Sequence, residues 1–438
     1  LQSTVLTVTD AGGNTATCSA AITVLDNIAP TVTCQNITVA LNSAGEAVLT
    51  PAMVAMSITD NCPYTATLSD SVMDCGNLHA TAPTNYALNF AGGGQRLEVA
   101  NEANFDVSTA VTVETWFKWD GSNPNAWHGL VAKRDVNEIS NFGITFHPNN
   151  NTLIWYFWNG NGNQNITIPM NSNGITAGVW KHFSSKFQQV GANVVARLYI
   201  DGLLIQQALM TNQTLAGGLN NVPVHIGNTR PNNENFFGTM DEVRIWNTAR
   251  TMAQIQANIY APLAGNEPGL VGYWPMNNGP GSGIATDVSG NGNTATLTSM
   301  NTTTAWVASG ASLYGTPSGL STVTLTVNDN HGNTATCNST VTIQDNIGPI
   351  ATCHDITLTV TDFYLGAQIG GFSVNNGSSD NCVINRYSIP NGTFFCADAG
   401  VHPTLLTVSD ATGNSSTCMA NVTVVDNCCN LVVTLVGT

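Results

Sequence analysis

Three kinds of residue in this sequence could do chemistry: acidic–amide pairs, cysteines and clustered aromatic side chains. The pairs Asp26-Asn27, Asp345-Asn346 and Asp426-Asn427 recur, each a few residues after a cysteine. Carboxylate and amide oxygens are the hard ligands that Ca²⁺ prefers. The same side chains also cap turns by bonding their own backbone, and one copy alone would favour that role. Because the whole set is repeated, calcium binding and turn capping both stay open.

The segment 153–158 is a run of aromatic and apolar residues that could hold a ligand. On a strand, Trp155 and Phe157 share one face, and Tyr156 and Trp158 share the other. One face should belong to a core, and the other could hold a sugar through ring faces and nearby polar groups. The candidate ligand-binding residues are Trp127, His128, Tyr156 and Trp158. The alternative is that neighbouring strands, loops or another chain cover both faces.

The composition excludes several classes of partner. Only 9% of the residues are charged, against about 25% in ordinary soluble proteins. The formal net charge of −16 would repel a phosphate backbone and an anionic membrane, so we expect no nucleic-acid binding. The sequence has no run of eighteen apolar residues, so we expect no membrane insertion.

The elements that must position these residues are short strands in a repeated unit. One phrase occurs three times, at 8–18, 327–337 and 408–418, and each copy ends in a cysteine. Residues 323–327 alternate valine or leucine with threonine, which is the period of a strand with one buried face. A glycine-containing hairpin turn follows. Each unit is therefore expected to be a small antiparallel sandwich.

One copy of the unit is interrupted. The chain passes from Cys396 to Cys418 in 22 residues, but needs 262 residues between the equivalent Cys75 and Cys337. About 240 residues are therefore inserted in the earlier copy. Such an insertion is feasible where the termini of the guest domain lie close together.

The repeated unit resembles the hyalin-repeat (HYR) family of extracellular immunoglobulin-like modules. The matching motifs are the hairpin Asp-x-x-Gly-Asn-x-x-x-Cys and the junction Asp-Asn-Ile-x-Pro, and the units cover roughly 190 residues. The resemblance implies tandem immunoglobulin-like sandwiches that are secreted or held at a cell surface.

Eleven cysteines in recurring contexts indicate an oxidising compartment and disulfides. Four cysteines allow three pairings, and the family resemblance does not fix which one is used. We favour pairs that join the first strand to the last or that join near neighbours. These pairs are Cys34 with Cys337, Cys62 with Cys75, Cys353 with Cys418 and Cys382 with Cys396, while Cys18 would pair upstream.

The inserted segment contains longer strands, aromatic residues and nearly all the basic residues. Its landmarks are Val-Glu-Thr-Trp-Phe at 113–117, Trp-Lys-His-Phe at 180–183, Leu-Tyr-Ile-Asp-Gly at 198–202, the Met-Asp-Glu-Val-Arg-Ile-Trp run at 240–246, and Leu-Val-Gly-Tyr-Trp at 270–274. In this order they resemble the laminin G-like (concanavalin A-like) jelly roll, which implies a two-sheet sandwich. One amphipathic helix is expected over about 251–260.

The predicted fold class is all-β, with tandem Ig-like sandwiches and a laminin G-like jelly roll inserted into one of them. The predicted domains are 1–27, the C-terminal part of a preceding repeat; 28–79 plus 316–345, a discontinuous repeat; 80–315, the jelly roll; 346–427, a further repeat; and 428–438, the start of a following unit.

Catalysis is not expected. Hydrolases that share the jelly roll use a Glu-x-Asp-x-x-Glu pattern to bring an acid and a nucleophile together. This pattern does not occur in the sequence. Asp241 and Glu242 form the nearest pair, but adjacent residues on a strand point to opposite faces. The chain is therefore predicted to be non-enzymatic.

The immunoglobulin-like resemblance implies two calcium sites at domain junctions, similar to the cadherin linker, and calcium there would stiffen the chain. The first set is Asp26, Asn27, Asp60, Asp329 and Asn333, and the second is Asp345, Asn346, Asp380, Asp410 and Asn414. In the jelly roll, Asp287, Asn291 and Asn293 resemble a loop that holds calcium in relatives. However, the acidic residue that the family usually has near its first strand is replaced by Gly92-Gly93-Gly94-Gln95.

These features predict a segment of a long secreted surface adhesin or fibre, resembling the large repetitive adhesins of bacteria. The jelly roll would bind a glycan or a surface protein. A second hypothesis is a homo-oligomeric filament in which the jelly roll contacts further copies of the chain. A third is an accessory region of a large secreted glycan-degrading enzyme.

Overall fold

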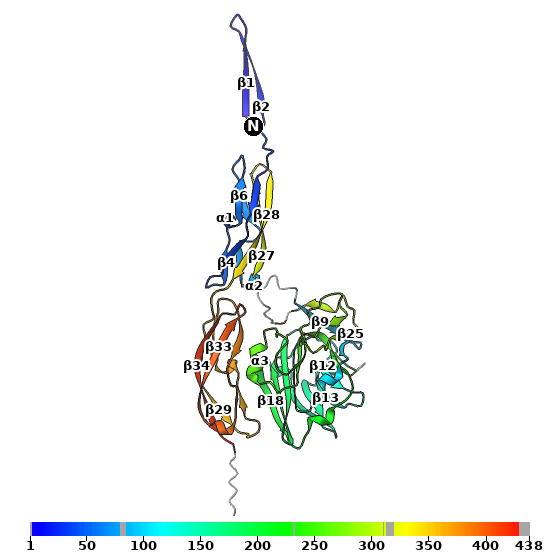
Figure 1. Ribbon diagram of the computed structural model, residues 1–438. Helices are drawn as coiled ribbons and strands as arrows, with labels where there is room; N and C mark the ends of the chain where they lie inside the picture. Colours follow the sequence, from blue (N-terminus) through cyan, green and yellow to red (C-terminus); the bar gives the residue numbers. More distant parts are fainter. Residues whose placement is uncertain (1, 79–84, 231–232, 310, 312–318, 429–438) are drawn as a thin grey trace, which may run out of the picture. The chain divides into compact units, whose positions relative to one another are not determined.

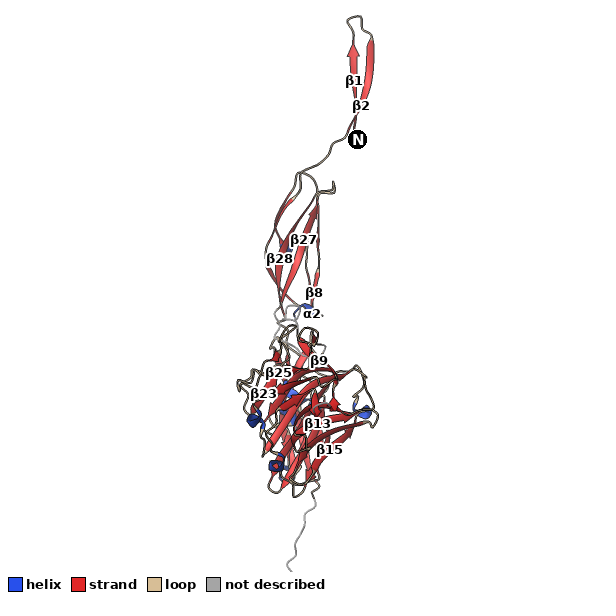
Figure 2. Ribbon diagram, turned by 90° about the vertical axis from the view of Figure 1, so that its right-hand side faces the viewer, coloured by secondary structure: helices blue, strands red, loops and turns tan. Residues whose placement is uncertain are grey.

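The computed structural model describes residues 2–78, 85–230, 233–309, 311 and 319–428. Its regular elements are almost all strands (Figure 2), which confirms the all-β class. The chain forms two compact units, Leu1–Thr81 with Ser318–Asn346, and Ala82–Pro317 with Ile347–Thr438. Apart from Cys428, the predicted start of a following unit at 428–438 lies outside the described residues.

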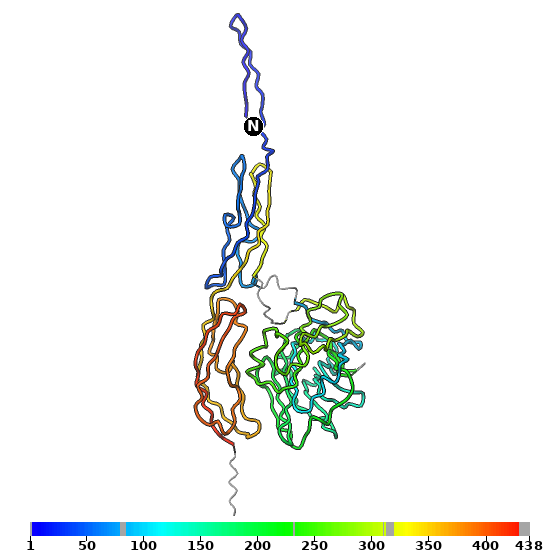
Figure 3. The backbone as a smooth tube through the Cα atoms, viewed as in Figure 1, coloured from blue at the N-terminus to red at the C-terminus, as the bar shows by residue number. Residues whose placement is uncertain are grey.

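The first unit contains a hairpin and a small sandwich (Figure 1). The hairpin pairs β1 (Gln2–Thr9) with β2 (Thr15–Ile22). The elements of the sandwich are β3 (Thr31–Cys34), β4 (Ile37–Ala40), β5 (Glu46–Val48), α1 (Pro51–Val54), β6 (Ala55–Thr59), β7 (Thr65–Leu68), β8 (Val72–Asp74), α2 (Cys75–Leu78), β27 (Leu320–Asn328) and β28 (Thr334–Gln344). One sheet has the order β4-β28-β27-β7, so strands from before the insertion (blue) and after it (yellow) lie side by side (Figure 3).

Strands in which apolar and polar residues alternate form the core of this sandwich. Val323, Leu325 and Val327 on β27 are fully buried, while the threonines between them are half-buried. Cys34 on β3 and Cys337 on β28 form a disulfide, with their Cα atoms 5.7 Å apart, beside the same core. Because so small a core buries little apolar surface, the disulfide, by constraining the unfolded chain, is a major source of stability.

The second unit contains another sandwich, whose main sheet has the same strand order as that of the first. Its elements are β29 (Ile356–Val360), β30 (Ala367–Gln368), α4 (Gly371–Val374), β31 (Ile384–Ser388), β32 (Thr393–Phe394), β33 (Gly400–Asp410) and β34 (Ser415–Asp426). The sheet order β29-β34-β33-β31 repeats β4-β28-β27-β7, including the parallel first pair. Cys353 and Cys418 form a disulfide, equivalent to the one between Cys34 and Cys337. Both long-range pairs agree with the sequence-based choice.

Two predicted disulfides, Cys62 with Cys75 and Cys382 with Cys396, are wrong. Cys62 carries a free thiol, and Cys396 bonds to Cys428, with Cα atoms 6.2 Å apart. Cysteines that are near in sequence here lie at opposite ends of the strands between them.

The geometry of the first unit shows why. The Cys62 sulfur lies near the β27–β28 hairpin, within 4.8 Å of a ring nitrogen of His331. The Cys75 sulfur lies 3.5 Å from the Gly45 carbonyl, in the turn after β4, and β4 pairs with the far end of β28. An eleven-residue strand such as β28 spans about 36 Å, whereas disulfide Cα atoms lie about 4.4–6.8 Å apart.

The inserted domain is a jelly roll of two large sheets. The first sheet contains, in spatial order, β15 (Asn163–Pro169), β14 (Thr152–Trp158), β13 (Ser140–His147), β12 (His128–Arg134), β19 (Val224–Ile226), β10 (Arg96–Val99), β25 (Ala295–Thr298) and β24 (Ile284–Ala285). The second contains β18 (Leu203–Met210), β17 (Asn193–Ile200), β16 (Lys181–Val190), β11 (Ala110–Trp119), β22 (Phe237–Trp246), β9 (Tyr86–Ala91) and β26 (Trp306–Ala308), with β23 (Leu270–Trp274) also on β22. A ribbon pairs β20 (Asn228–Arg230) with β21 (Asn233–Asn235).

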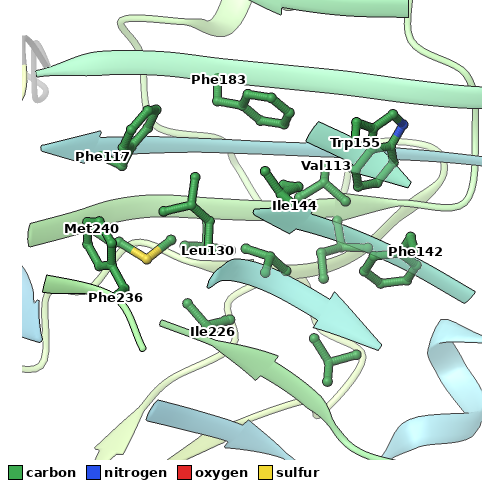
Figure 4. Packing of buried hydrophobic residues seen from close by; sticks show 14 of the residues in the cluster. Val113, Phe117, Leu130, Phe142, Ile144, Trp155, Phe183, Ile226, Phe236 and Met240 are labelled. Atoms are coloured by element: carbon green, nitrogen blue, oxygen red, sulfur yellow. The ribbon is translucent and has the colours of Figure 1, made fainter. Parts of the chain in front are cut away.

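The inner faces of the two sheets form one apolar core (Figure 4). Trp155 on β14 stacks on Phe187 of β16, with ring centroids 4.8 Å apart and planes within 12°. Phe117, Phe142 and Phe183 extend the same core. These contacts join the sheets and fix which face of each strand points outward.

The outer face of the second sheet carries a buried ionic network. Glu114 on β11 is fully buried and accepts a hydrogen bond from Arg250 Nη1 at 2.6 Å. Arg244 on β22 pairs with Glu242. Burial lowers the pKa of His182 well below its usual value, so that this neighbour of Glu114 is neutral. The carboxylates of Glu114 and Glu242 are thus paired with buried arginines.

The helix α3 (Met252–Asn258) joins the jelly roll to the neighbouring sandwich of the same unit. Its N-terminus is closed by a capping box between Thr251 and Gln254. Met252 and Ile255 are buried against the jelly roll, in agreement with the predicted apolar face. Ala253, on another face, belongs to the core of the sandwich. The helix therefore packs on both domains.

We predict that Glu114→Gln lowers the free energy of unfolding by about 3 kcal/mol, because Arg250 would keep a buried charge without a partner. Glu98→Gln is the matched control, since Glu98 pairs with Arg96 and its side chain is 33% exposed; its effect should be below about 1 kcal/mol. Urea unfolding of both variants measures the difference. If Glu114→Gln lowers the free energy of unfolding no more than about 1 kcal/mol, as expected for Glu98→Gln, the buried network does not stabilise the domain.

Candidate ligand-binding groove

The alternation on β14 places aromatic rings on both faces of the first sheet. Trp155 and Phe157 lie in the core between the sheets. Ile154, Tyr156 and Trp158 alternate with them and therefore project from the outer face. This outer face is where a ligand can reach the strand.

Tyr156 lies across the neighbouring strand β13 because residue 143 is glycine. Gly143 is the cross-strand partner of Tyr156, and a Cβ atom built on Gly143 would be 2.3 Å from the tyrosine ring. The ring consequently reaches Arg134 on β12, whose Nη1 lies 3.4 Å from the Tyr156 hydroxyl. Tyr156 is 6% exposed and forms the floor of a groove.

An ion pair fixes one wall of the groove. Arg134 Nη1 donates to both carboxylate oxygens of Glu234, at 3.1 and 3.0 Å. Glu234 lies on the ribbon strand β21, in the left-handed region at φ 53°, and also accepts a hydrogen bond from Thr229. The carboxylate is therefore held rigidly beside the Tyr156 hydroxyl. Burial raises the pKa of Tyr156, so its hydroxyl stays protonated near neutral pH.

The opposite wall consists of exposed amides from β15. Asn165 is the cross-strand partner of Tyr156, and Asn163 is the partner of Trp158. Both asparagines are exposed, so their amide groups can donate and accept hydrogen bonds. The indole of Trp127, which packs edge-on against His147 at 5.2 Å, also lines the groove.

The resulting groove has a volume of about 170 Å³. It is smaller than the roughly 300–1,000 Å³ of pockets that enclose drug-sized ligands, so it suits a single ring of a longer ligand. Its lining residues are Trp127, Arg134, Thr145, Ile154, Tyr156, Asn163, Asn165 and Glu234.

Two of the four predicted ligand-binding residues meet in this groove. Trp127 and Tyr156 line it. His128 is fully buried and stacks on Phe146, with ring centroids 4.8 Å apart, and burial lowers its pKa. Trp158 is half-buried at the end of β14 and does not line the groove. His128 is part of the core because it begins β12, whose residues are all buried.

The sequence-based reasoning missed the polar walls. Asn163 and Asn165 could have been found, because they alternate on the strand that follows Tyr156. Arg134 and Glu234 are 100 residues apart in sequence, and no local pattern connects them.

The carboxylates of Asp241 and Glu242 are both engaged in the interior. Asp241 accepts hydrogen bonds from Ser309 Oγ and from the Glu242 main-chain nitrogen. Glu242 accepts the Tyr273 hydroxyl at 2.8 Å and pairs with Arg244. Burial and the Glu242 charge raise the pKa of Asp241. The two side chains hold strands together and face no groove.

The predicted calcium loop of the jelly roll is organised by hydrogen bonds. Asp287 Oδ1 accepts from the main-chain nitrogens of Tyr273 and Ser289, and Oδ2 accepts from Ser289 Oγ and the Asn293 nitrogen. The Asn291 side chain donates its amide to main-chain carbonyls. Donors thus occupy the Asp287 oxygens that a cation would need, so these residues fit a turn better than a calcium ion.

Four of the five residues of the first predicted junction set, Asp26, Asp60, Asp329 and Asn333, lie close together within the first unit. The Asp26 carboxylate accepts from Asn61 Nδ2, and Asn333 Nδ2 donates to the Asp26 carbonyl at 3.0 Å. The hydrogen bond to Asp26, burial and the nearby charges of Asp26, Asp60 and Asp329 raise the pKa of the Cys62 thiol. The Oδ1 atom of Asp60 is buried without a hydrogen-bond partner. An orphaned carboxylate oxygen of this kind fits a bound cation.

Two further residues beside the first junction set could bind a metal ion, while hydrogen bonds already engage Asp329. Asp26, Cys62 and His331 each offer a ligand atom, all within 4.8 Å of one another. Asp329 accepts three hydrogen bonds from the turn that it closes. Asn27 is exposed. The structure therefore adds a thiol and an imidazole that the sequence-based prediction did not include.

The second predicted junction set divides between the two units. Asp345 and Asn346 belong to the first unit, and Asp380, Asp410 and Asn414 belong to the second. Asp410 Oδ1 accepts from the main-chain nitrogens of residues 412–414, which caps the β33–β34 hairpin. This calcium site remains a prediction.

Residues 91–256 match the family model of the concanavalin A-like lectin/glucanases superfamily, which confirms the laminin G-like jelly roll. A comparison with curated proteins gives no match. Among solved structures, domains LG4-5 of the mouse laminin alpha1 chain match at 16% identity and TM-score 0.27, covering 40% of this chain and 43% of that one. The chain thus spans less than half of that laminin structure.

Two further structures are similar at the same level. The CBM40 of the Ruminococcus gnavus IT-sialidase, bound to alpha2,3 sialyllactose, has 14% identity and TM-score 0.31, covering 39% of this chain and 95% of that one. The native heptameric SAP-like pentraxin of Limulus polyphemus has 16% identity and TM-score 0.29, covering 40% and 82%. We base the function on the groove itself.

We predict that Gly143→Ala displaces the Tyr156 ring and lowers the free energy of unfolding by about 1–3 kcal/mol, because the added methyl group overpacks the site. Gly162→Ala is the control, since no atom lies within 4 Å of a Cβ at that position. Urea unfolding compares the two. Similar stabilities would contradict the close fit of Tyr156 on Gly143.

Proposed function

We propose that the jelly roll is a glycan-binding module of a secreted, adhesive protein. The observation that carries this proposal is the groove in which Trp127 and Tyr156 face exposed amides and a fixed carboxylate. Sugar rings bind by packing their apolar face on an aromatic ring while their hydroxyls exchange hydrogen bonds with amide and carboxylate groups. The groove offers both kinds of contact within the width of one ring.

The alternative filament function needs an exposed contact surface. Stable interfaces between copies bury about 800 Å² on each partner and have an apolar centre. The groove has a volume of only about 170 Å³, so it offers little area to another copy. A groove of this size suits one ring of a ligand better than a large protein contact.

The rest of the chain fits a stalk that presents this module. The two small sandwiches share one strand order and one disulfide position. Their disulfides and the laminin G-like domain fit an extracellular protein. None of the helices in the described part of the chain could span a bilayer. The resemblance to HYR modules and to bacterial adhesins supports an adhesive role over an accessory role in a glycan-degrading enzyme.

We expect the whole chain to bind specific sugars on a glycan array, and Trp127→Ala to weaken that binding by about tenfold, the loss of about 1.4 kcal/mol. Trp158→Ala is the matched control, because Trp158 lies on the same outer face of β14 but outside the groove. It should keep the affinity within about twofold.

Equal losses in the two variants would place the ligand elsewhere. A chain that binds no glycan but self-associates in sedimentation velocity would favour the filament.

We further propose that Ca²⁺ binds beside Asp26, Asp60 and Asp329 and fixes the linker that leads into the first sandwich. The converging carboxylates and the orphaned Asp60 oxygen support this site. The linker is already held there by Asn61 and Asn333. A cation would replace the mutual repulsion of the carboxylates by attraction.

If the dissociation constant is about 0.1 mM, 1 mM Ca²⁺ should stabilise the unit by about 1.4 kcal/mol, and EDTA should remove the effect. Asp60→Asn should abolish it, whereas Asp70→Asn, in a turn that only caps Val72, should not. The measurement is the thermal unfolding midpoint of each variant with Ca²⁺, with Zn²⁺ and with EDTA. Stabilisation by Zn²⁺ but not by Ca²⁺ would contradict the proposal and assign the metal to Cys62 and His331.

A further inference from the structure

Two buried cations of the jelly roll have no ionic partner among the residues that the structure describes. Among the buried lysines and arginines of the described chain, those at 133, 134, 244 and 250 lie within ion-pair distance of a carboxylate. Lys186 and Arg197 are 1% and 4% exposed and form no such pair within the described residues. A chain with net charge −16 has ample carboxylates, so the isolation of these two cations is unusual.

The two cations lie side by side. Lys186 on β16 and Arg197 on β17 are direct cross-strand partners. Lys186 Nζ donates to the Arg250 carbonyl at 2.7 Å, while Arg197 donates to Gln207 Oε1 and to the Leu365 carbonyl. All these acceptors are neutral. Burial and the nearby Arg197 charge lower the pKa of Lys186 to about 7, which shows how poorly the free protein compensates this charge.

Both side chains border the same cavity, which has a volume of about 590 Å³. This volume lies within the range of small-molecule sites. Gln188 and Thr251 from the jelly roll and Gln368 from the neighbouring sandwich of the same unit supply polar groups. Tyr364 and Phe395 supply rings that are 49% and 42% exposed. The cavity thus combines a positive end, hydrogen-bonding groups and aromatic faces.

We propose that this cavity binds an anionic sugar, with its carboxylate or sulfate group between Lys186 and Arg197 and its ring against Tyr364 and Phe395. Uncompensated buried charge is costly, and an oxyanion would satisfy both cations through charge-assisted hydrogen bonds. The overall negative charge of the chain keeps other surfaces from attracting such a ligand. This site is separate from the groove at Tyr156 and does not depend on the function proposed for that groove.

The test titrates the whole chain with glucuronate, glucose 6-sulfate and glucose by calorimetry. We expect one or both anionic sugars to bind and glucose to bind at least about tenfold more weakly, since it lacks the charge. Binding of glucuronate alone assigns a carboxylate ligand, and binding of glucose 6-sulfate alone assigns a sulfate. Failure of both anionic sugars to bind, or equal binding of glucose, would overturn the proposal.

The key variant is Lys186→Met, which should lose about tenfold or more in affinity while its unfolding midpoint stays equal or rises, because a poorly compensated charge is removed. A merely structural lysine would instead lower the midpoint. Lys118→Met is the matched control: Lys118 also lacks an ion pair in the described chain but lies over the Trp180 ring. It should bind like the wild type.

If Lys186→Met does not fold, Arg197→Gln takes its place with the same expected loss of affinity. Unchanged affinity in a folded Lys186→Met or Arg197→Gln variant would overturn the proposal. Trp127→Ala should leave the binding of anionic sugars intact, so failure at one site is distinguishable from failure at the other.

Discussion

The packing of Trp155 on Phe187 across the two sheets is the contact on which the groove depends. A strand has a side-chain period of two, so a slip of one residue would exchange its faces. With Trp155 and Phe157 held in the core, Tyr156 has only the outer face available. Gly143 then allows its ring to lie over β13. The shape of the groove is therefore a consequence of how the core is packed.

Several of the few charges in the jelly roll lie in buried or half-buried ion pairs. Glu114 with Arg250 and Glu242 with Arg244 hold the region around α3 on the second sheet. Arg134 with Glu234 fixes a wall of the groove. The small sandwiches, which contain almost no basic residues to pair with their carboxylates, are closed by disulfides instead. Lys186 and Arg197 differ from these ion-paired residues, because neither forms an ion pair within the described chain. Their position indicates a role that the fold itself does not require.

The periodicity of apolar residues predicted the strands and the helix well, because these elements depend on residues that are near one another in the sequence. The alternation at Val323, Leu325 and Val327 gave a strand with one buried face, and the apolar spacing at Met252 and Ile255 gave the helix. The long disulfide between Cys34 and Cys337 followed from the repeat. The all-β class and the jelly roll are thus readable from the sequence.

What the sequence did not give depends on distances across the folded chain. Cys396 bonds to Cys428, which is 32 residues away in the sequence. Arg134 meets Glu234 through the β20–β21 ribbon, and His128 is part of the core although a loop precedes it. Which side of a strand is covered, and by which distant residue, is decided by tertiary packing.

The most direct test of glycan binding by the jelly roll is a crystal structure of the chain soaked with a glycan chosen from array binding. The account predicts a sugar ring between Trp127 and Tyr156, with its hydroxyls on Asn163, Asn165 and Glu234. A glycan bound at another face, with this groove filled only by water, would contradict it.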